Sequence, residues 1–309
     1  MIFPPAFHPG DTVALVATSS PPSPQLAEET VKRTVAALEQ RGYGVWQAPS
    51  LGVRTERGYA AAPADMRAAD LHAAFRDPDI RAVWAIRGGS TAMELLPLLD
   101  YELIRASPKP FIGFSDVTAL HAVLPQRCGF VTFHGPVAKH LGEEPEAFTL
   151  TSLFQTLDMG ASLTVENPPE APLRALRGGR AEGELTGGNL SLLSALMGTP
   201  YEPDVRGKIL FLEDVGEAVY RLDRMLRQLR FGGLFDDAAG VVLGDFTRCR
   251  NAYREEYGAA ELLRDFFADY DKPVLAGLKA GHCRPTLTLP MGCRCRLDAD
   301  RAALTLLRD

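Results

Sequence analysis

Short apolar runs alternate with helical patterns along the first half of the chain, and this alternation limits the possible folds more than any other feature. The strand-like runs cover residues 12–18, 80–89, 110–115 and 129–137, and helical spacing covers residues 26–42 and 63–78. Strands separated by helices of this length form right-handed βαβ units and a parallel sheet. We therefore expect an α/β domain over residues 1–139.

The second half of the chain has a different pattern. Residues 140–179 mix acidic, proline and glycine residues, and we expect them to form an interdomain connection. From residue 180 onward, a strand at 208–214 precedes an amphipathic helix at 217–230, with Val219, Leu222, Leu226 and Leu229 on one side. The last 25 residues or so alternate as strands do. We expect a mixed α+β domain over residues 180–309.

Composition excludes several classes of function. The net charge is −6 and no basic cluster occurs, so binding to nucleic acid is not expected. Five cysteines, an odd number without a disulfide pattern, indicate a reducing compartment. No basic region precedes a long apolar core at the N-terminus, and no apolar run reaches the ~18 residues of a membrane span. We expect a cytoplasmic protein that does not contact the membrane.

A metal site is not expected either. Cys293 and Cys295 share one face of a strand-like segment, but the second ligand pair of a zinc site is missing. The chain also lacks an HExxH motif. We predict that the protein uses no metal and no cofactor.

Polar residues follow three of the predicted strands: Thr18-Ser19-Ser20, Arg87-Gly88-Gly89-Ser90 and Ser115-Asp116. Function gathers at the carboxyl ends of strands in parallel sheets. Ser115 lies between a strand and a helix, where a serine is either a helix N-cap or a nucleophile on a strained elbow. Gly113 permits the close approach that such an elbow needs, but Val117 stands where the usual pattern has a second glycine. The pattern leaves both interpretations open.

A nucleophilic serine needs a base and a group that orients the base. His282 lies in a glycine-flanked loop and could reach a cleft, and His134 at a strand end is an alternative. His121, one and a half turns into the helix after Ser115, should point away from the elbow. Glu213 ends an apolar strand, where a charge needs a partner. Asp214 and Glu217 are alternative acids.

Several segments together resemble one family. They are "RGG" after a strand, "PFIGFSD", "HGPV", "GGNL", "ILFLEDVGEAVYRLDRML" and the "GH" at residue 282. In this order and spacing they resemble the LD-carboxypeptidases, serine peptidases of family S66, which include murein tetrapeptide carboxypeptidases and microcin C immunity peptidases. The resemblance runs from the first strand to about residue 290.

The resemblance implies a role for each candidate. Ser115 would be the nucleophile, Glu213 the acid and His282 the base. Backbone amides of Asp116 and of Gly88 or Gly89 would form the oxyanion hole. The family fold would place Ser115 in a flavodoxin-like N-terminal domain, the acid and base in the C-terminal domain, and the active site in a cleft between them. Family members are commonly homodimers.

The substrate implied is a small peptide. Murein-type members would release terminal D-alanine from the murein tetrapeptide in cytoplasmic wall recycling, whereas immunity-type members inactivate peptidyl-nucleotide antibiotics. Ser90 and Thr91 follow the two glycines where the murein-recycling members tend to read "RGGYG", which keeps the second substrate open. Arg87 is a candidate for holding the terminal carboxylate, or else a structural arginine paired with an acid.

Two interpretations outside the family also remain open at this point. An esterase of the α/β-hydrolase type has the same order of serine, acid and histidine, although the chain lacks an HGGG-type oxyanion motif. The other is a non-catalytic flavodoxin-like binding module, in which Ser115 would not react with an active-site-directed serine reagent.

Overall fold

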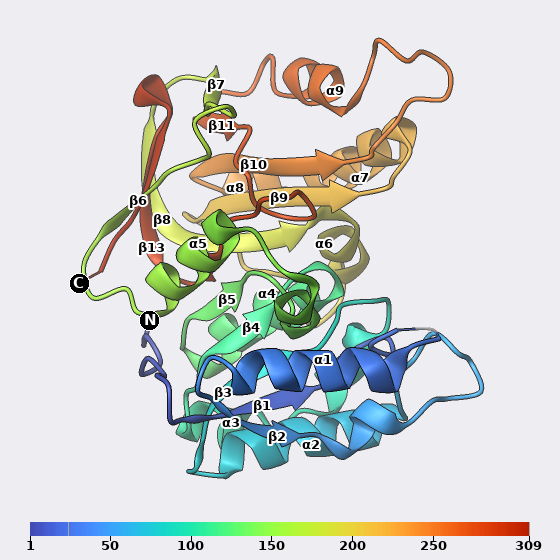
Figure 1. Ribbon diagram of the computed structural model, residues 1–309. Helices are drawn as coiled ribbons and strands as arrows, with labels where there is room; N and C mark the ends of the chain where they lie inside the picture. The colour runs from blue at the N-terminus through green and yellow to red at the C-terminus, as the bar shows by residue number, and fades with distance from the viewer. Residues whose placement is uncertain (24, 309) are drawn as a thin grey trace. The chain divides into compact units, whose positions relative to one another are not determined.

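The protein is described here as a computed structural model, which covers residues 1–23 and 25–308 (Figure 1). The chain forms two compact units. The first, here the N-terminal domain, comprises Met1–Asp158 together with Thr288–Pro290. The second, the C-terminal domain, comprises Met159–Leu287 and the residues from Met291 onward.

The N-terminal domain contains a six-stranded sheet with the order β12-β5-β4-β3-β1-β2. Strands β1 to β5 are parallel, with the flavodoxin-like order 2-1-3-4-5. The predicted parallel α/β domain is therefore confirmed. The strands are β1 Thr12–Val16, β2 Gly44–Gln47, β3 Ile80–Ala85, β4 Phe111–Gly113, β5 Thr132–His134 and β12 Leu289–Met291.

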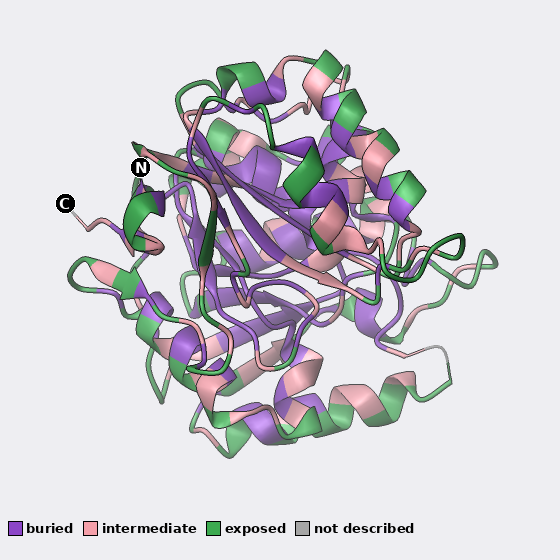
Figure 2. Ribbon diagram, turned by 90° about the horizontal axis from the view of Figure 1, so that it is seen from above, coloured by how far each residue is buried: buried purple, intermediate pink, exposed green. Residues whose placement is uncertain are grey.

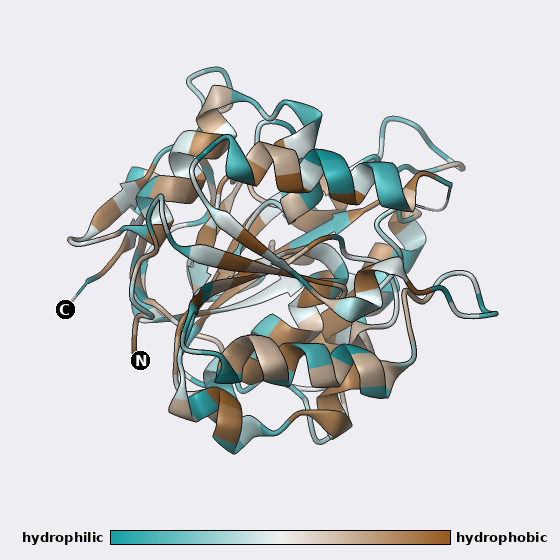
Figure 3. Cartoon of the chain, turned by 60° about the horizontal axis from the view of Figure 1, so that its bottom comes forward, coloured by the Kyte–Doolittle hydropathy of each residue, from teal (hydrophilic) through white to brown (hydrophobic). Residues whose placement is uncertain are grey.

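Residues 26–42 and 63–78 contain helices, as the sequence pattern predicts, and the domain has further helices. The helices of this domain are α1 Ala27–Glu39, α2 Ala64–Arg76, α3 Tyr101–Ala106, α4 Thr118–Cys128 and α5 Ala147–Leu157, with 3₁₀ turns η1 Pro49–Gly52, η2 Ala92–Leu98, η3 Ser115–Val117 and η4 Ala138–Glu143. In Figure 2 the strands are mostly buried, whereas the helices alternate between buried and exposed residues. Figure 3 shows the same alternation as hydrophobic and hydrophilic positions along the helices.

The C-terminal domain contains an eight-stranded sheet with the order β6-β14-β13-β8-β9-β10-β11-β7. Strands β8 to β11 are parallel and the flanking strands are antiparallel, so the predicted mixed domain is confirmed. The strands are β6 Leu163–Val165, β7 Arg174–Arg177, β8 Arg180–Asn189, β9 Ile209–Val215, β10 Gly240–Thr247, β11 Val274–Ala276, β13 Arg294–Asp298 and β14 Ala303–Leu306.

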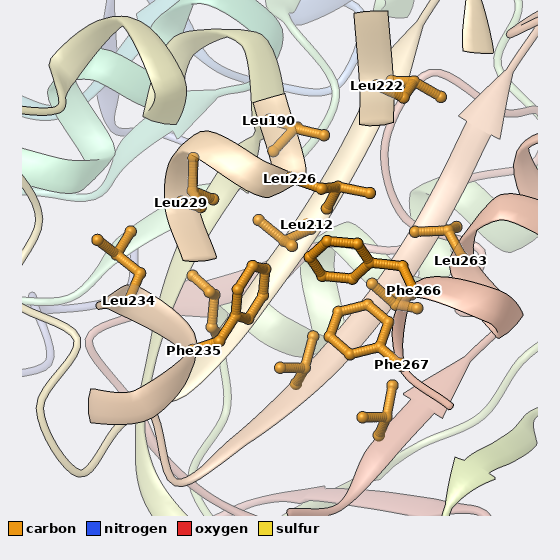
Figure 4. Close-up of a cluster of buried hydrophobic side chains, with 14 of the residues drawn as sticks. Leu190, Leu212, Leu222, Leu226, Leu229, Leu234, Phe235, Leu263, Phe266 and Phe267 are labelled. Carbon is orange, nitrogen blue, oxygen red and sulfur yellow. The ribbon is translucent and has the colours of Figure 1, made fainter. Parts of the chain in front are cut away.

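The core of the C-terminal domain lies where its helices cover the parallel strands. The helices are α6 Leu190–Leu196, α7 Val219–Phe231, α8 Leu234–Asp237 and α9 Ala259–Phe266, with a 3₁₀ turn η5 at Ala299–Arg301. The four residues predicted for the apolar side of α7 are all buried. Figure 4 shows three of them, Leu222, Leu226 and Leu229, in one cluster with Phe235 and Phe266. Burial of this apolar area fixes α7 on the sheet.

The segment 140–179, expected to be an interdomain connection, contains ordered elements of both domains. Helix α5 belongs to the N-terminal domain, where Thr156 Oγ1 donates to the carbonyl of Thr288 and Ser152 Oγ accepts from the Thr288 amide. Strands β6 and β7 lie at opposite edges of the C-terminal sheet. The expected range 180–309 also differs, because residues 288–290 return to the N-terminal domain.

No helix among residues 1–23 and 25–308 is long and apolar enough to cross a membrane.

Two positions on α7 test how the core holds this helix. Leu226 is fully buried, and Leu226→Ala should lower the free energy of unfolding by about 2–5 kcal/mol, because it removes apolar contacts and leaves a cavity. Phe231 on the same helix is 83% exposed, and Phe231→Ala should change stability by less than about 1 kcal/mol. Urea unfolding followed by circular dichroism measures both. Equal losses would contradict this account of the core.

Candidate active site

Ser115 lies on a strained elbow between β4 and α4. Its φ angle is +66°, a value that non-glycine residues rarely adopt. Neither η3 nor α4 has a side-chain hydrogen bond at its N-cap, which is Phe114 and Val117 respectively. Ser115 is therefore not the helix cap that one interpretation of the sequence suggested. Unusual backbone geometry of this kind gathers at functional sites.

The elbow explains why valine replaces the second glycine of the usual pattern. A Cβ atom on Gly113 would lie 3.0 Å from Val117 Cγ1 and 3.1 Å from Ala85 Cβ. The side chain of Val117 thus occupies the space that the missing side chain of Gly113 leaves. Here the elbow has one glycine, Gly113, and the Val117 side chain packs against the position where Gly113 lacks a Cβ atom.

The turn after β3 lies directly against the elbow. A Cβ atom on Gly88 would come within 2.9 Å of Ser115 Cβ, and one on Gly89 within 2.0 Å of Ser20 Oγ. Gly89 also has a φ of +154°, so both positions favour glycine. Three of the predicted strand ends, those of β1, β3 and β4, therefore belong to neighbouring strands and meet at one edge of the sheet.

Glu213 and His282, the predicted acid and base, contact each other in the C-terminal domain. Glu213 Oε2 lies 2.8 Å from His282 Nδ1, and the Glu213 side chain is completely buried. An ionised carboxylate only accepts hydrogen bonds, so Nδ1 carries the proton. In a neutral imidazole with its proton on Nδ1, Nε2 has the lone pair that a general base requires.

The sheet supplies the surroundings of Glu213. Asn189 of β8 is its register partner, and the side-chain Nδ2 of Asn189 donates to Glu213 Oε1 at 3.2 Å. A Cβ atom on Gly281 would lie 2.6 Å from Glu213 Oε2, so the loop that carries His282 approaches the carboxylate closely. Burial raises the pKa of Glu213, and the hydrogen bonds from His282 and Asn189 partly offset that effect.

The two alternative acids have other partners. Asp214 accepts hydrogen bonds from the amide of Ser191 at 2.9 Å and from its hydroxyl at 2.8 Å, in the first turn of α6. Glu217 is partly exposed, and its Oε2 lies 3.6 Å from Nη1 of Arg221 in α7. Of the three acids, Glu213 is the one hydrogen-bonded to His282.

His121 differs from its prediction, because it supports the elbow instead of pointing away from it. His121 Nε2 lies 2.8 Å from the carbonyl of Gly113, and Nδ1 lies 2.8 Å from Thr132 Oγ1. A carbonyl only accepts, so Nε2 donates and Nδ1 accepts from the hydroxyl. The helical position alone did not reveal that the ring crosses back to β4. His134, the alternative base, is buried with its ring 6.0 Å from those of Phe114 and His121.

Arg87 is half-buried beside the Gly88 turn. Its Nη1 donates to the carbonyl of Pro21 at 3.1 Å. Arg87 forms no ion pair with any of the described residues, so the pairing with an acid that one interpretation suggested is not observed.

The described residues contain neither a cluster suited to a metal ion nor a disulfide. No group of three His, Cys, Asp or Glu side chains in the described ranges is arranged to hold a metal ion. All five cysteines are free and buried. Burial raises the pKa of Cys283, the neighbour of His282, to about 11 and keeps its thiol neutral.

Comparison with known proteins identifies the family. The LD-carboxypeptidase N-terminal domain matches residues 13–135, and the LD-carboxypeptidase C-terminal domain of peptidase family S66 matches residues 182–297. A probable murein peptide carboxypeptidase of Bacillus subtilis is 39% identical over 97% of this chain and 93% of its own. The chain belongs to the LD-carboxypeptidase family.

Two further relatives have solved structures that are similar to this chain. The microcin C7 self-immunity protein MccF of Escherichia coli is 29% identical over 96% of this chain and 93% of its own. The structure of MccF with glutamyl sulfamoyl guanosine matches with a TM-score of 0.91 and 26% identity, covering 100% and 99% of the two chains. Muramoyltetrapeptide carboxypeptidase from Oxalobacter formigenes matches with a TM-score of 0.83 and 31% identity, covering 96% and 99%.

Sequence reasoning missed some residues around the candidate site of this LD-carboxypeptidase. Asn189 lies in the "GGNL" segment that carried the resemblance, but its contact with Glu213 depends on strand register. Ser19 was noticed as part of a polar strand end, but not as a partner of Asp116. Arg67, buried in α2, gave no signal, because its sequence neighbours resemble those of an ordinary surface helix.

His121 leads to a prediction about pH and stability. Burial lowers its pKa from 6.5 to about 4, so the unfolded chain binds a proton there more readily than the folded chain. This contribution to stability is complete above pH 6.5 and is lost as the pH falls towards about 4, by up to about 3 kcal/mol. His121→Gln keeps a donor for Gly113 and does not titrate. Urea unfolding from pH 7 to 4 should therefore show a shallower fall for the variant, and parallel curves would contradict the assignment.

Proposed function

We propose that the protein is a serine-type LD-carboxypeptidase with Ser115 as nucleophile, His282 as general base and Glu213 as the acid that orients it. The observation that carries this proposal is the hydrogen bond between the buried Glu213 carboxylate and His282 Nδ1. It gives the imidazole the tautomer needed to accept a proton at Nε2. The positive φ of Ser115 after β4 supports its role as the nucleophile.

The proposed reaction follows from these groups. His282 Nε2 takes the Ser115 proton as Oγ attacks the carbonyl carbon of the scissile amide, and then gives that proton to the leaving amine. Water, activated by the same histidine, hydrolyses the acyl-enzyme. The N–H groups of Asp116 and of Gly88 or Gly89 would donate to the oxyanion. The reaction requires His282 of one domain to reach Ser115 of the other in the working enzyme.

The substrate that we propose is a murein tetrapeptide, from which the enzyme releases terminal D-alanine in cytoplasmic wall recycling. The names of the Bacillus subtilis and Oxalobacter formigenes relatives support this class of substrate. Five free cysteines support a reducing compartment. Arg87 is the candidate for holding the terminal carboxylate, since it lies beside Gly88 and its observed partner is a neutral carbonyl. We further propose that the enzyme is a homodimer.

A second candidate substrate is a peptidyl-nucleotide of the microcin C type. The match to MccF bound to glutamyl sulfamoyl guanosine favours it, as does Ser90, which stands where an aromatic residue is expected in murein-type enzymes. Membership of the LD-carboxypeptidase family leaves the α/β-hydrolase esterase and the non-catalytic module without support.

Substitutions in the proposed triad test the mechanism. Ser115→Ala and His282→Ala should each lower kcat by about 10³-fold or more, because nucleophile and base act as one unit. Glu213→Gln should also lower kcat strongly, whereas Glu217→Gln, the matched control on the same segment, should have little effect. Steady-state kinetics with folded variants, verified by circular dichroism, measures this. Loss of activity in Glu217→Gln but not in Glu213→Gln would make the assignment wrong.

Three candidate substrates distinguish between the murein-type and the immunity-type activity. The enzyme is incubated with L-Ala-γ-D-Glu-meso-diaminopimelate-D-Ala, with its L-Ala-terminated diastereomer, and with a peptidyl-adenylate analogue, and products are identified by mass spectrometry. Release of D-Ala from the first peptide alone is expected, because an L-terminal methyl group would be forced out of its pocket. Cleavage of the adenylate analogue alone would assign the protein to the immunity type.

A further inference from the structure

The side chain of Asp116, the residue after Ser115, makes contacts that its predicted backbone role does not explain. The carboxylate is 1% exposed. Its Oδ2 accepts hydrogen bonds from Ser19 Oγ and, at 2.7 Å, from the backbone amide of Ala92. A buried carboxylate is stable only where donors compensate its lost hydration. These two donors come from the chain beyond β1 and from the start of η2, after the glycine turn.

The same two segments are joined a second time through the backbone of Thr91. The Thr91 amide donates to Ser19 Oγ at 3.2 Å, and the Thr91 carbonyl accepts from Arg67 Nη1 at 3.2 Å. Arg67 Nη1 also donates to the carbonyl of Thr18 at 2.8 Å. Thr91 is therefore held on both sides, and the turn that contains Gly88 and Gly89 is anchored at its end.

Arg67 supplies a buried positive charge to this group of residues. Its side chain is completely buried and forms an ion pair with Glu94 of η2 at 2.7 Å. Glu94 in turn pairs with Arg57 at 2.7 Å. A guanidinium stays charged even when burial lowers its pKa, as it does here. One polar network thus links the ends of β1, β3 and β4: Asp116, Ser19, Thr91 and Arg67 are buried, and Glu94 is partly exposed.

We propose that Asp116 is a positioning residue, whose carboxylate holds the Ser115 elbow against the Gly88 turn through Ser19 and Ala92. The inference rests on the proposed function, in which Ser115 is the nucleophile and the Gly88 turn supplies oxyanion donors. A non-glycine φ of +66° persists only where the surroundings hold it. The carboxylate acts through other groups, since it is buried and its Oδ2 is held by Ser19 and Ala92.

The anchoring has a specific consequence for catalysis. Gly88 is so close to Ser115 that a Cβ atom there would meet Ser115 Oγ at 3.2 Å. A small shift of the turn relative to the elbow would move the proposed oxyanion amides away from the nucleophile. Displacement of about 1 Å can cost on the order of 10²-fold in rate. Loss of the anchor should therefore lower kcat much more than it changes KM.

The experiment compares substitutions at two buried carboxylates of the N-terminal domain. Asp116→Ala removes the acceptor of Ser19 and Ala92, whereas Asp116→Asn keeps a side-chain oxygen that can replace it. Asp70 is the matched control, because it is also buried and accepts a backbone hydrogen bond, from Ser50 at 2.9 Å. For each full-length variant, kcat, KM and Tm are measured on the tetrapeptide, together with hydrogen exchange of the backbone amides.

We expect Asp116→Ala to lower kcat by about 10²-fold with KM nearly unchanged, and Asp116→Asn to recover most of that loss. Asp70→Ala should lower Tm and leave kcat within about threefold of the wild type. Amides in residues 88–92 and 113–118 should exchange faster in Asp116→Ala than in Asp70→Ala. Unchanged kcat and exchange in Asp116→Ala, or equal effects in Asp70→Ala, would overturn the proposal.

The exchange measurement separates this proposal from the proposed function. It reports the anchoring of the elbow without any turnover. If the wild-type enzyme cleaves no peptide, the proposed function fails, and faster exchange confined to the two segments still supports the anchor. If the wild type cleaves the tetrapeptide but Asp116→Ala neither slows it nor loosens the elbow, only the anchor is wrong.

Discussion

The hydrogen bond between the buried Glu213 carboxylate and His282 is the interaction on which the proposed chemistry of this LD-carboxypeptidase depends. A charge without access to water needs partners, and it has two: His282 from the loop after β11 and Asn189 from the neighbouring strand β8. The glycine at 281 permits the loop to approach. The same contact that stabilises the charge also favours the imidazole tautomer that the proposed base needs.

The N-terminal domain must instead hold Ser115 in a strained backbone conformation. Three strand ends converge there because β4, β3 and β1 are neighbours in a parallel sheet. The segments pack so closely that positions 88, 89 and 113 leave little room for a side chain and are glycines. Buried polar groups hold the segments in place. The buried polar groups around the proposed nucleophile maintain its strained backbone.

Much of this was predictable from local sequence patterns. Strand and helix periodicity predicted the parallel domain and the buried side of α7, and a charge following an apolar run in β9 indicated that Glu213 has a partner. Contacts between distant segments were not predictable in this way. The return of residues 288–290 to the N-terminal sheet, the packing of α5 in that domain and the burial of Arg67 depend on tertiary structure. Likewise, the direction of the His121 ring is set by its hydrogen bonds to Gly113 and Thr132, which its position in the helix does not reveal.

The central claim is that Ser115 is a nucleophile activated by His282. Its most direct test is covalent labelling with a fluorophosphonate, followed by mass spectrometry of the intact protein and of its peptides. The account predicts one adduct per chain, located on Ser115, formed rapidly by the wild type and at least about 10²-fold more slowly by His282→Ala. An adduct on another residue, no adduct, or equal labelling rates in the two proteins would contradict it.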